Sequence, residues 1–179
     1  DLLAEVAVGR ALVDSADDVR NFVRKTLAYE HAADAYLSRV SMAGEYLGFG
    51  GVSEYAKPML EQVRLGGSND TYFTTGFANS RYVSLFNTTR NLYDTDRVWS
   101  PDDMIRLINE GVHVINHLGH ANNDYNLKLT TADLPRLSNT HYGFVYSQGC
   151  MAGWFDESGS FAEELTSMAS GAFATVMNA

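Results

Sequence analysis

The chain has 179 residues, 45% of them hydrophobic and 20% charged, with a net charge of −9 at pH 7. This length and composition suit the core of one domain, so we expect a single domain over residues 1–179. Acidic residues outnumber basic ones and no run of Lys or Arg occurs, which argues against nucleic acid as a partner. No apolar stretch is long enough to span a membrane, and the amino terminus lacks the pattern of a signal peptide.

The amino-terminal part of the chain predicts two strands around one helix. The first strand is expected over Glu5–Arg10. A helix is expected to start at Ser15, where acidic residues follow a capping serine, and to reach about His31, with an extension to Leu37 left open. The next strand is predicted over Arg39–Gly44, and a glycine-rich loop follows it.

The middle of the chain has a weaker pattern. Residues Ser53–Val63 have helical spacing, with Ser53 as the expected cap, and Thr71–Thr75 resembles a strand. We expect Gly76–Val98 to be mostly irregular because it is polar and aromatic with little periodicity. Ser100 is then expected to cap a helix, since Pro and two Asp residues follow it directly.

Two apolar runs dominate the remaining sequence. They cover Gly111–His120 and Tyr142–Cys150, and a short helical segment is expected between them at Thr131–Leu137. A helix beginning at Ser160 and a last strand over Ala172–Met177 complete the prediction. Strands that alternate with helices indicate an α/β fold with a mainly parallel sheet covered on both faces.

Each of these two apolar runs ends in a side chain that can do chemistry. Ligands bind at the carboxyl ends of strands in open α/β sheets, so neighbouring strands would place His120 and Cys150 at one crevice. Cys150 is the only cysteine in the chain and therefore cannot form an internal disulfide. The sequence leaves two readings for it, a buried core residue or a nucleophile.

The spacing of these motifs carries a family resemblance. A hydrophobic strand that ends Leu-Gly-His, followed 30 positions later by one that ends Gln-Gly-Cys, resembles the gingipain family of cysteine peptidases and, more distantly, caspases and legumain. The segments Glu5–Arg10, Ile105–His120 and Phe161–Leu165 fit that family in order. The resemblance implies a caspase-like three-layer sandwich. It also implies that the chain is an incomplete piece, which lacks its first strand and its carboxyl-terminal part.

The resemblance implies a cysteine endopeptidase that acts through an acyl-enzyme. His120 would move the proton and the Cys150 thiolate would attack the peptide carbonyl, since a free thiol has a pKa of about 8.5 and histidine titrates near neutrality. The backbone amides of Cys150 and Ala121 would form the oxyanion hole. Gingipains usually carry glycine after the histidine, so Ala121 would impair activity if that position needs a positive φ.

The same resemblance suggests further site residues and partners. Glu54 is the expected acidic residue that orients the histidine, with Glu45 as the second candidate, and Met151 and Trp154 would line the substrate groove. Substrates would be proteins or peptides, with cleavage after a basic residue as in the best-known family members. No cofactor is implied, and the family suggests a secreted or cell-surface protein. The sequence does not fix the oligomeric state.

Three alternatives remain beside this reading. One is a sortase-like transpeptidase in which an amine resolves the acyl-enzyme. Another is a non-catalytic surface or binding module, which is suggested by Ala121 in place of the usual glycine. A zinc site at His113, His117 and His120 is disfavoured because ligands along one strand point to opposite sides. Calcium as a structural ion stays open, although turns are favoured for the oxygen-bearing side chains Asn122, Asn123, Asp124 and Asn126.

Overall fold

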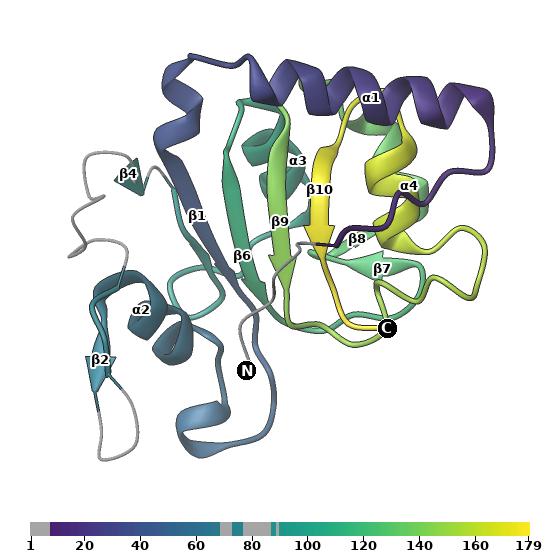
Figure 1. Cartoon of the computed structure of the whole chain (residues 1–179). Coiled ribbons are helices and arrows are strands. Elements are labelled where there is room, and N and C mark those ends of the chain that lie inside the picture. Colours follow the sequence, from purple (N-terminus) through teal and green to yellow (C-terminus); the bar gives the residue numbers. More distant parts are fainter. Residues whose placement is uncertain (1–7, 69–72, 77–86, 89) are drawn as a thin grey trace, which may run out of the picture.

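A parallel β-sheet forms the centre of the protein in the computed structural model, which describes residues 8–68, 73–76, 87–88 and 90–179 (Figure 1). Within those ranges the sheet has six strands in the order β10-β9-β6-β1-β4, and β5 also pairs with β1. The strands are β1 (Arg39–Gly44), β4 (Asn87–Thr88), β5 (Leu92–Tyr93), β6 (Val114–Leu118), β9 (Gly143–Ser147) and β10 (Ala172–Val176). Two small antiparallel pairs lie outside it, β2 (Gly67–Ser68) with β3 (Phe73–Thr74), and β7 (Tyr125–Asn126) with β8 (Leu129–Thr130).

Helices cover both faces of this sheet. The α-helices are α1 (Ala16–Glu30), α2 (Lys57–Leu65), α3 (Pro101–Asn109) and α4 (Phe161–Ser167), and the 3-10 turns are η1 (Ala35–Ser38), η2 (Gly51–Ser53) and η3 (Thr131–Arg136). Alternate residues of each strand point to opposite faces, so each strand contributes to two cores. Ile115 and Val145 pack with α3 and α4, whereas Val40 and Met42 pack with α2. Burying each large apolar side chain contributes about 1.5–3 kcal/mol. The expected three layers are confirmed.

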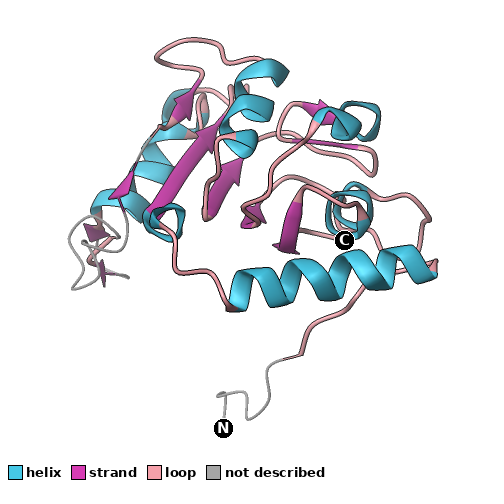
Figure 2. Cartoon of the chain, turned by 90° about the horizontal axis from the view of Figure 1, so that it is seen from above, coloured by secondary structure: helices cyan, strands magenta, loops and turns pink. Residues whose placement is uncertain are grey.

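Helix α1 closes the amino-terminal edge of the sheet, where it crosses the beginnings of the strands (Figures 1 and 2). Its Tyr29 ring stacks on Phe173 at 3.8 Å, and its hydroxyl lies 2.9 Å from His113 Nε2. Lys25 is fully buried, and its Nζ donates to the carbonyls of Ala172 at 2.8 Å and Ser170 at 3.0 Å. Burial lowers the pKa of the Lys25 ammonium to about 7.

The predicted helix starts are largely confirmed. Ser15, Ser100 and Ser160 each cap a helix, with the serine side chain accepting a backbone N–H of the first turn. The extension of the first helix to Leu37 is wrong, because α1 ends at Glu30 and the turn that follows closes on it through the His31 N–H and the Leu27 carbonyl. The expected cap at Ser53 is also wrong. That residue lies in η2, and α2 begins four residues later at Lys57, where Pro58 suits the first turn.

The strand predictions have a mixed outcome. The strands over 39–44, 111–120, 142–150 and 172–177 are confirmed, and Arg39–Gly44 has the predicted bounds. In the strand expected at Glu5–Arg10, residues 5–7 lie outside the described residues. Val8–Arg10 are not a strand, since they pair with none of the described strands, and their side chains are exposed, Val8 by 91%. The described part of Gly76–Val98 is not wholly irregular, since β4 and β5 both pair with β1.

The strand expected at Thr71–Thr75 is present as β3, and residues 71–72 lie outside the described ranges. None of the helices in the parts of the chain that the structure describes is both long enough and apolar enough to cross a membrane.

Candidate active site

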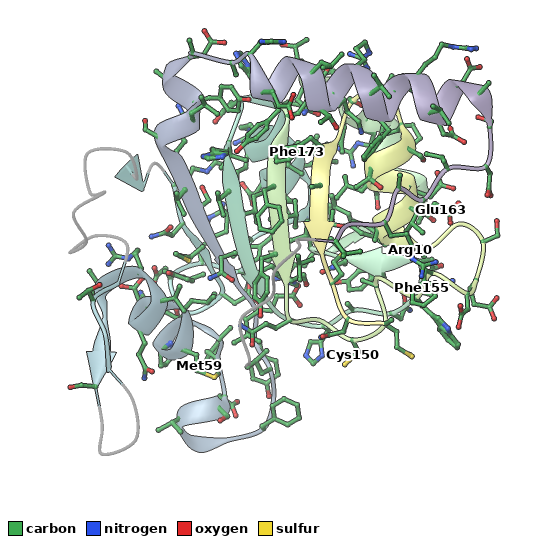
Figure 3. The ribbon with its side chains drawn as sticks, viewed as in Figure 1. Arg10, Met59, Cys150, Phe155, Glu163 and Phe173 are labelled. Carbon is green, nitrogen blue, oxygen red and sulfur yellow. The ribbon has the colours of Figure 1, made fainter. Side chains whose placement is uncertain are left out.

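The two central strands end side by side and lead to His120 and Cys150. Strands β6 and β9 are parallel neighbours in which His117 pairs with Ser147, and the pairing continues through a 3.0 Å hydrogen bond from the Gln148 N–H to the His117 carbonyl. Three residues further along each segment lie His120 and Cys150, both of them exposed. Cys150 therefore lies at the carboxyl-terminal edge of the sheet, opposite the edge that carries Phe173 (Figure 3).

The segments that hold these two residues touch one another. A Cβ placed on Gly149 would come within 2.5 Å of the Ala121 Cβ and 3.4 Å of the Gly119 carbonyl oxygen. The residue before Cys150 is thus wedged between the two neighbours of His120, and only glycine leaves room for this approach. Among the described residues no hydrogen bond joins the thiol to the imidazole. Such bonds are often long before substrate binds.

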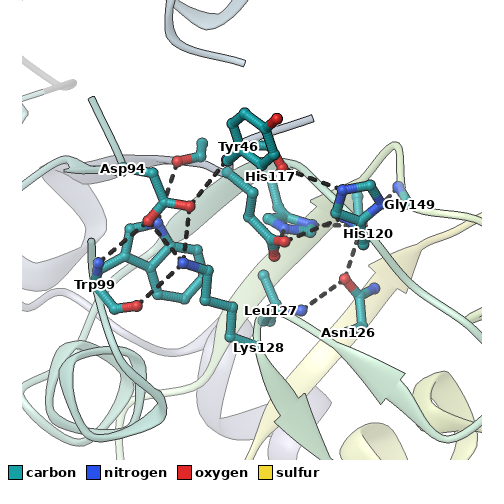
Figure 4. Close-up of polar contacts among 12 residues, drawn as sticks. Tyr46, Asp94, Trp99, His117, His120, Asn126, Leu127, Lys128 and Gly149 are labelled. Atoms are coloured by element: carbon teal, nitrogen blue, oxygen red, sulfur yellow. Dashed lines mark hydrogen bonds and ion pairs between the residues drawn. The ribbon is translucent and has the colours of Figure 1, made fainter. Parts of the chain in front are cut away.

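Loop residues that follow β1 hold His120 in place (Figure 4). The Glu45 carboxylate accepts the His120 backbone N–H at 3.2 Å, and the Tyr46 carbonyl lies 3.1 Å from His120 Nε2. A carbonyl oxygen can only accept, so Nε2 carries a proton and the neutral ring keeps its lone pair on Nδ1. A backbone carbonyl therefore orients the histidine.

The structure does not bring Glu54 to His120. No hydrogen bond or ion pair between them occurs in the described ranges. The Glu54 carboxylate lies instead beside the Tyr46 hydroxyl, where it raises the pKa of that phenol. The reason is local, because η2 turns the chain so that Glu54 faces back across its own loop, with its carbonyl accepting the Leu47 N–H.

Glu45, the second candidate, belongs to a buried polar network beneath the site. Its Oε1 lies 2.9 Å from His117 Nε2, and His117 Nδ1 lies 2.8 Å from Ser147 Oγ. Glu45, His117 and Ser147 are each no more than 3% exposed. Buried polar groups of this kind are costly unless they are paired, so the network fixes the end of β1 against β6 and β9.

The direction of the hydrogen bonds assigns the protons in this network. The Leu127 N–H donates to Asn126 Oδ1, so that atom is an acceptor, and the Ser147 hydroxyl must donate to it. Ser147 Oγ then accepts from His117 Nδ1. One further proton lies between His117 Nε2 and Glu45 Oε1, so the two side chains together carry no net charge. Both ring nitrogens of His117 are therefore engaged in hydrogen bonds.

The two predicted oxyanion-hole amides have no intramolecular acceptor in the part of the chain that the structure describes. These are the backbone N–H groups of Ala121 and Cys150. Positive φ angles at non-glycine residues of that part occur at Leu127, Lys128 and Met151, and Ala121 is not among them. Ala121 therefore does not have the positive φ that would strain an alanine, and its backbone is unstrained at this position.

The predicted groove residues both remain accessible. Met151 is 42% exposed and Trp154 37% exposed, and the Trp154 N–H closes a turn on the Met151 carbonyl at 3.2 Å. Met151 has a φ of 52°, an uncommon conformation for a non-glycine residue. Strained residues of this kind cluster at functional sites, and this one directly follows Cys150.

The oxygen-bearing segment after His120 is organised as turns. Asn122 Oδ1 accepts the Asp124 N–H at 3.0 Å, while Asn126 is fully buried and accepts the Leu127 N–H at 2.8 Å. The described residues include no group of three His, Cys, Asp or Glu side chains that could share a metal ion.

Comparison with known proteins places this chain in a family. The sequence matches the model of peptidase family C25 over residues 1–179. No curated protein matches the chain. Its fold resembles the crystal structure of the Arg-specific cysteine proteinase gingipain R (RgpB), with a TM-score of 0.73 and 19% identity over 93% of this chain and 38% of that one.

A second similar structure is the complex of the pro- and mature domains of RgpB from Porphyromonas gingivalis. Here the TM-score is 0.69, with 19% identity over 96% of this chain and 40% of that one. At this identity the likeness establishes the fold alone, and the expected caspase-like fold is confirmed. The chain spans 38% and 40% of the length of the two proteins that it resembles.

Proposed function

Because the chain belongs to peptidase family C25, a family of cysteine peptidases, we propose that it carries the catalytic pair of a cysteine endopeptidase. His120 is the proton carrier and Cys150 the nucleophile. The observation that carries this proposal is the contact between Gly149 and Ala121, because it holds the segments of the two reactive residues together at the carboxyl-terminal edge of the sheet.

The first step is formation of the thiolate. With Nε2 donating to the Tyr46 carbonyl, Nδ1 of His120 is the nitrogen that takes the proton from the Cys150 thiol. The thiolate sulfur then forms a bond to the carbonyl carbon of the peptide, and the negative charge moves to the carbonyl oxygen. The amides of Cys150 and Ala121, which have no acceptor among the described residues, supply donors to that oxygen.

Collapse of the tetrahedral intermediate breaks the peptide bond. The imidazolium of His120 gives its proton to the leaving amine, and the acyl group remains on Cys150. A water molecule then attacks the acyl carbon while His120 takes one of its protons, and the thiolate leaves. The exposure of both side chains allows an extended peptide to reach them.

The proposal extends to substrate and location. We propose cleavage after a basic residue, supported by the described specificity of gingipain R, and a secreted or cell-surface protein, supported by the family. No step of the proposed mechanism needs a cofactor, and calcium would act only as a structural ion. Met151 and Trp154 are the proposed groove residues beside the nucleophile.

Cleavage of a mixed peptide library by the full-length protein, read by mass spectrometry, tests the function. Cys150→Ala and His120→Ala are the inactive controls, and each reaction is run with reductant, with calcium and with a chelator. We expect cuts after Arg or Lys that disappear in both variants. Ligated products would indicate a transpeptidase instead, and a folded but inert protein would favour the non-catalytic module.

A further inference from the structure

The turn between β7 and β8 has an unusual backbone. Leu127 and Lys128 both have φ of 56°, a conformation that costs roughly 1–2 kcal/mol per residue for L-amino acids. Leu127 is fully buried in the core shared with α3 and α4, which anchors the turn. Two consecutive residues of this kind persist only when their surroundings hold them, so the contacts of the turn must fix its backbone.

One side of the turn leads to His120 (Figure 4). Lys128 Nζ donates to both carboxylate oxygens of Asp94, at 2.6 and 2.8 Å, and to the Trp99 carbonyl at 3.1 Å. Asp94 in turn accepts the Tyr46 N–H at 2.9 Å, and the Tyr46 carbonyl accepts from His120 Nε2. Lys128 is thus joined to the imidazole through the Asp94 carboxylate and the backbone of Tyr46, whose N–H and carbonyl lie on either side of its Cα.

These contacts are shielded from solvent. The Asp94 side chain is 5% exposed and the Lys128 side chain 15% exposed, so their attraction is screened much less than that of a surface pair. All three ammonium protons of Lys128 have acceptors. The pair therefore fixes the Tyr46 N–H, in the same residue as the carbonyl that accepts from His120.

The other side of the turn leads to Cys150. Asn126 Oδ1 accepts the Ser147 hydroxyl at 3.1 Å, and Ser147 Oγ accepts the Gly149 N–H at 3.1 Å. Asn126 and Ser147 are buried, and Gly149 is the residue that precedes the nucleophile. This chain of hydrogen bonds therefore sets the direction in which the backbone leaves β9.

We propose that the β7–β8 turn is a brace that positions both members of the catalytic pair. Lys128 is a positioning residue for His120 and Asn126 is a positioning residue for Cys150. Neither touches the substrate, so each acts on the rate of the chemical step rather than on binding. The proposal rests on the proposed function and adds two residues for which the sequence indicated no part in catalysis.

The test uses two variants of the full-length protein. Lys128→Met combined with Asp94→Asn removes the pair without leaving a lone buried charge, and Asn126→Ala removes the link to Ser147. We expect kcat to fall about 10- to 100-fold in each, with KM within about twofold, because a displacement of the order of 1 Å at reacting groups has this effect. The matched control is Lys57→Met with Asp96→Asn, an exposed pair of the same chemistry that should leave kcat unchanged.

Alkylation of Cys150 by iodoacetamide supplies a second readout. We expect its pH profile to shift in the Lys128 and Asp94 double variant, in which the Tyr46 carbonyl that accepts from His120 Nε2 is no longer fixed, but not in the control. If either variant fails to fold, Lys128→Arg and Ser147→Ala replace them, with the same direction and a smaller effect expected. Unchanged kcat and unchanged alkylation in folded variants would overturn the brace.

The two proposals can fail separately. The full-length protein could cleave nothing while the Lys128 and Asp94 double variant and His120→Ala both alter the alkylation profile; the brace would then be supported and the peptidase proposal would be wrong. If the protein cleaves peptides and the brace variants match the wild type, only the brace falls.

Discussion

The two edges of the sheet bury charge in different ways. At the carboxyl-terminal edge the buried ionisable side chains are paired with one another, Lys128 with Asp94 and His117 with Glu45. At the amino-terminal edge Lys25 has only backbone carbonyls as partners, and no described carboxylate pairs with it. The paired groups fix the positions of the residues around them. Lys25 instead holds α1 on the sheet, and its burial without a counter-charge disfavours its charged form.

This difference separates two kinds of response. Substitutions at the carboxyl-terminal edge should alter the reactivity of Cys150, because the paired groups lead to it and to His120. Substitutions at the amino-terminal edge should alter the stability of the fold and its pH dependence, and should leave reactivity alone. Substitutions in the full-length protein test that separation.

The largest effect is expected for Glu45→Gln. The change leaves His117 buried beside a neutral amide and weakens the hold on the His120 backbone, so the free energy of unfolding should fall by about 3 kcal/mol. Urea denaturation measures the loss, and iodoacetamide labelling measures the reactivity. Glu54→Gln is the matched control and should change neither. A larger effect of Glu54→Gln would restore it as the orienting residue.

Gly149→Ala should reduce turnover about 100-fold with little loss of stability. The added methyl meets the Ala121 Cβ at 2.5 Å and pushes the segments of His120 and Cys150 apart. The double variant Gly149→Ala with Ala121→Gly removes that clash and should recover most of the activity, as measured by kcat. Independent, additive effects of the two substitutions would show that the segments do not touch.

Lys25→Met should change how stability depends on pH. The folded state holds Lys25 with a pKa of about 7 against 10.5 when unfolded, so between these values the unfolded chain binds more protons and stability rises with pH. Below pH 7 this group adds no slope. The wild type should gain about 1.4 kcal/mol per pH unit over Lys25→Met between pH 7.5 and 9.5 in urea denaturation. Parallel curves would contradict the burial of the amine.

The smallest effect is expected for Tyr29→Phe. His113 Nδ1 donates to the Leu37 carbonyl, so Nε2 accepts from the Tyr29 hydroxyl, and the variant leaves this nitrogen without a donor. Stability should fall by about 1 kcal/mol in thermal or urea unfolding, with kcat unchanged. A change in kcat would break the separation between the two edges.

Local signals in the sequence predicted most of the central strands and helix starts. The apolar runs and capping serines located the central strands and three helix starts, and the parallel register then placed His120 near Cys150. Errors occurred where tertiary contacts decided the outcome. Ser53 has the composition of a cap, yet the chain uses it in a 3-10 turn before α2.

The support of the site could not be predicted in this way. The group that orients His120 is a backbone carbonyl, which every residue has, so no side chain signals it. His117 looked like one more histidine on an apolar strand, and its partner Glu45 is 72 positions away. Lys128 and Asp94 are ordinary charged residues until the fold buries them together. Only the long-range packing gives these residues their roles.

The order of strands in the sheet determines when Cys150 becomes reactive during folding. Strand β1 lies between β6 and β4, and the Glu45 carboxylate meets a backbone amide 75 positions later in the chain. Contacts of such large sequence separation form slowly, because long loops must close before strand pairing can stabilise the chain. A refolding chain should therefore regain helix signal well before Cys150 becomes reactive toward an alkylating agent, and the delay between the two would time the assembly of the sheet.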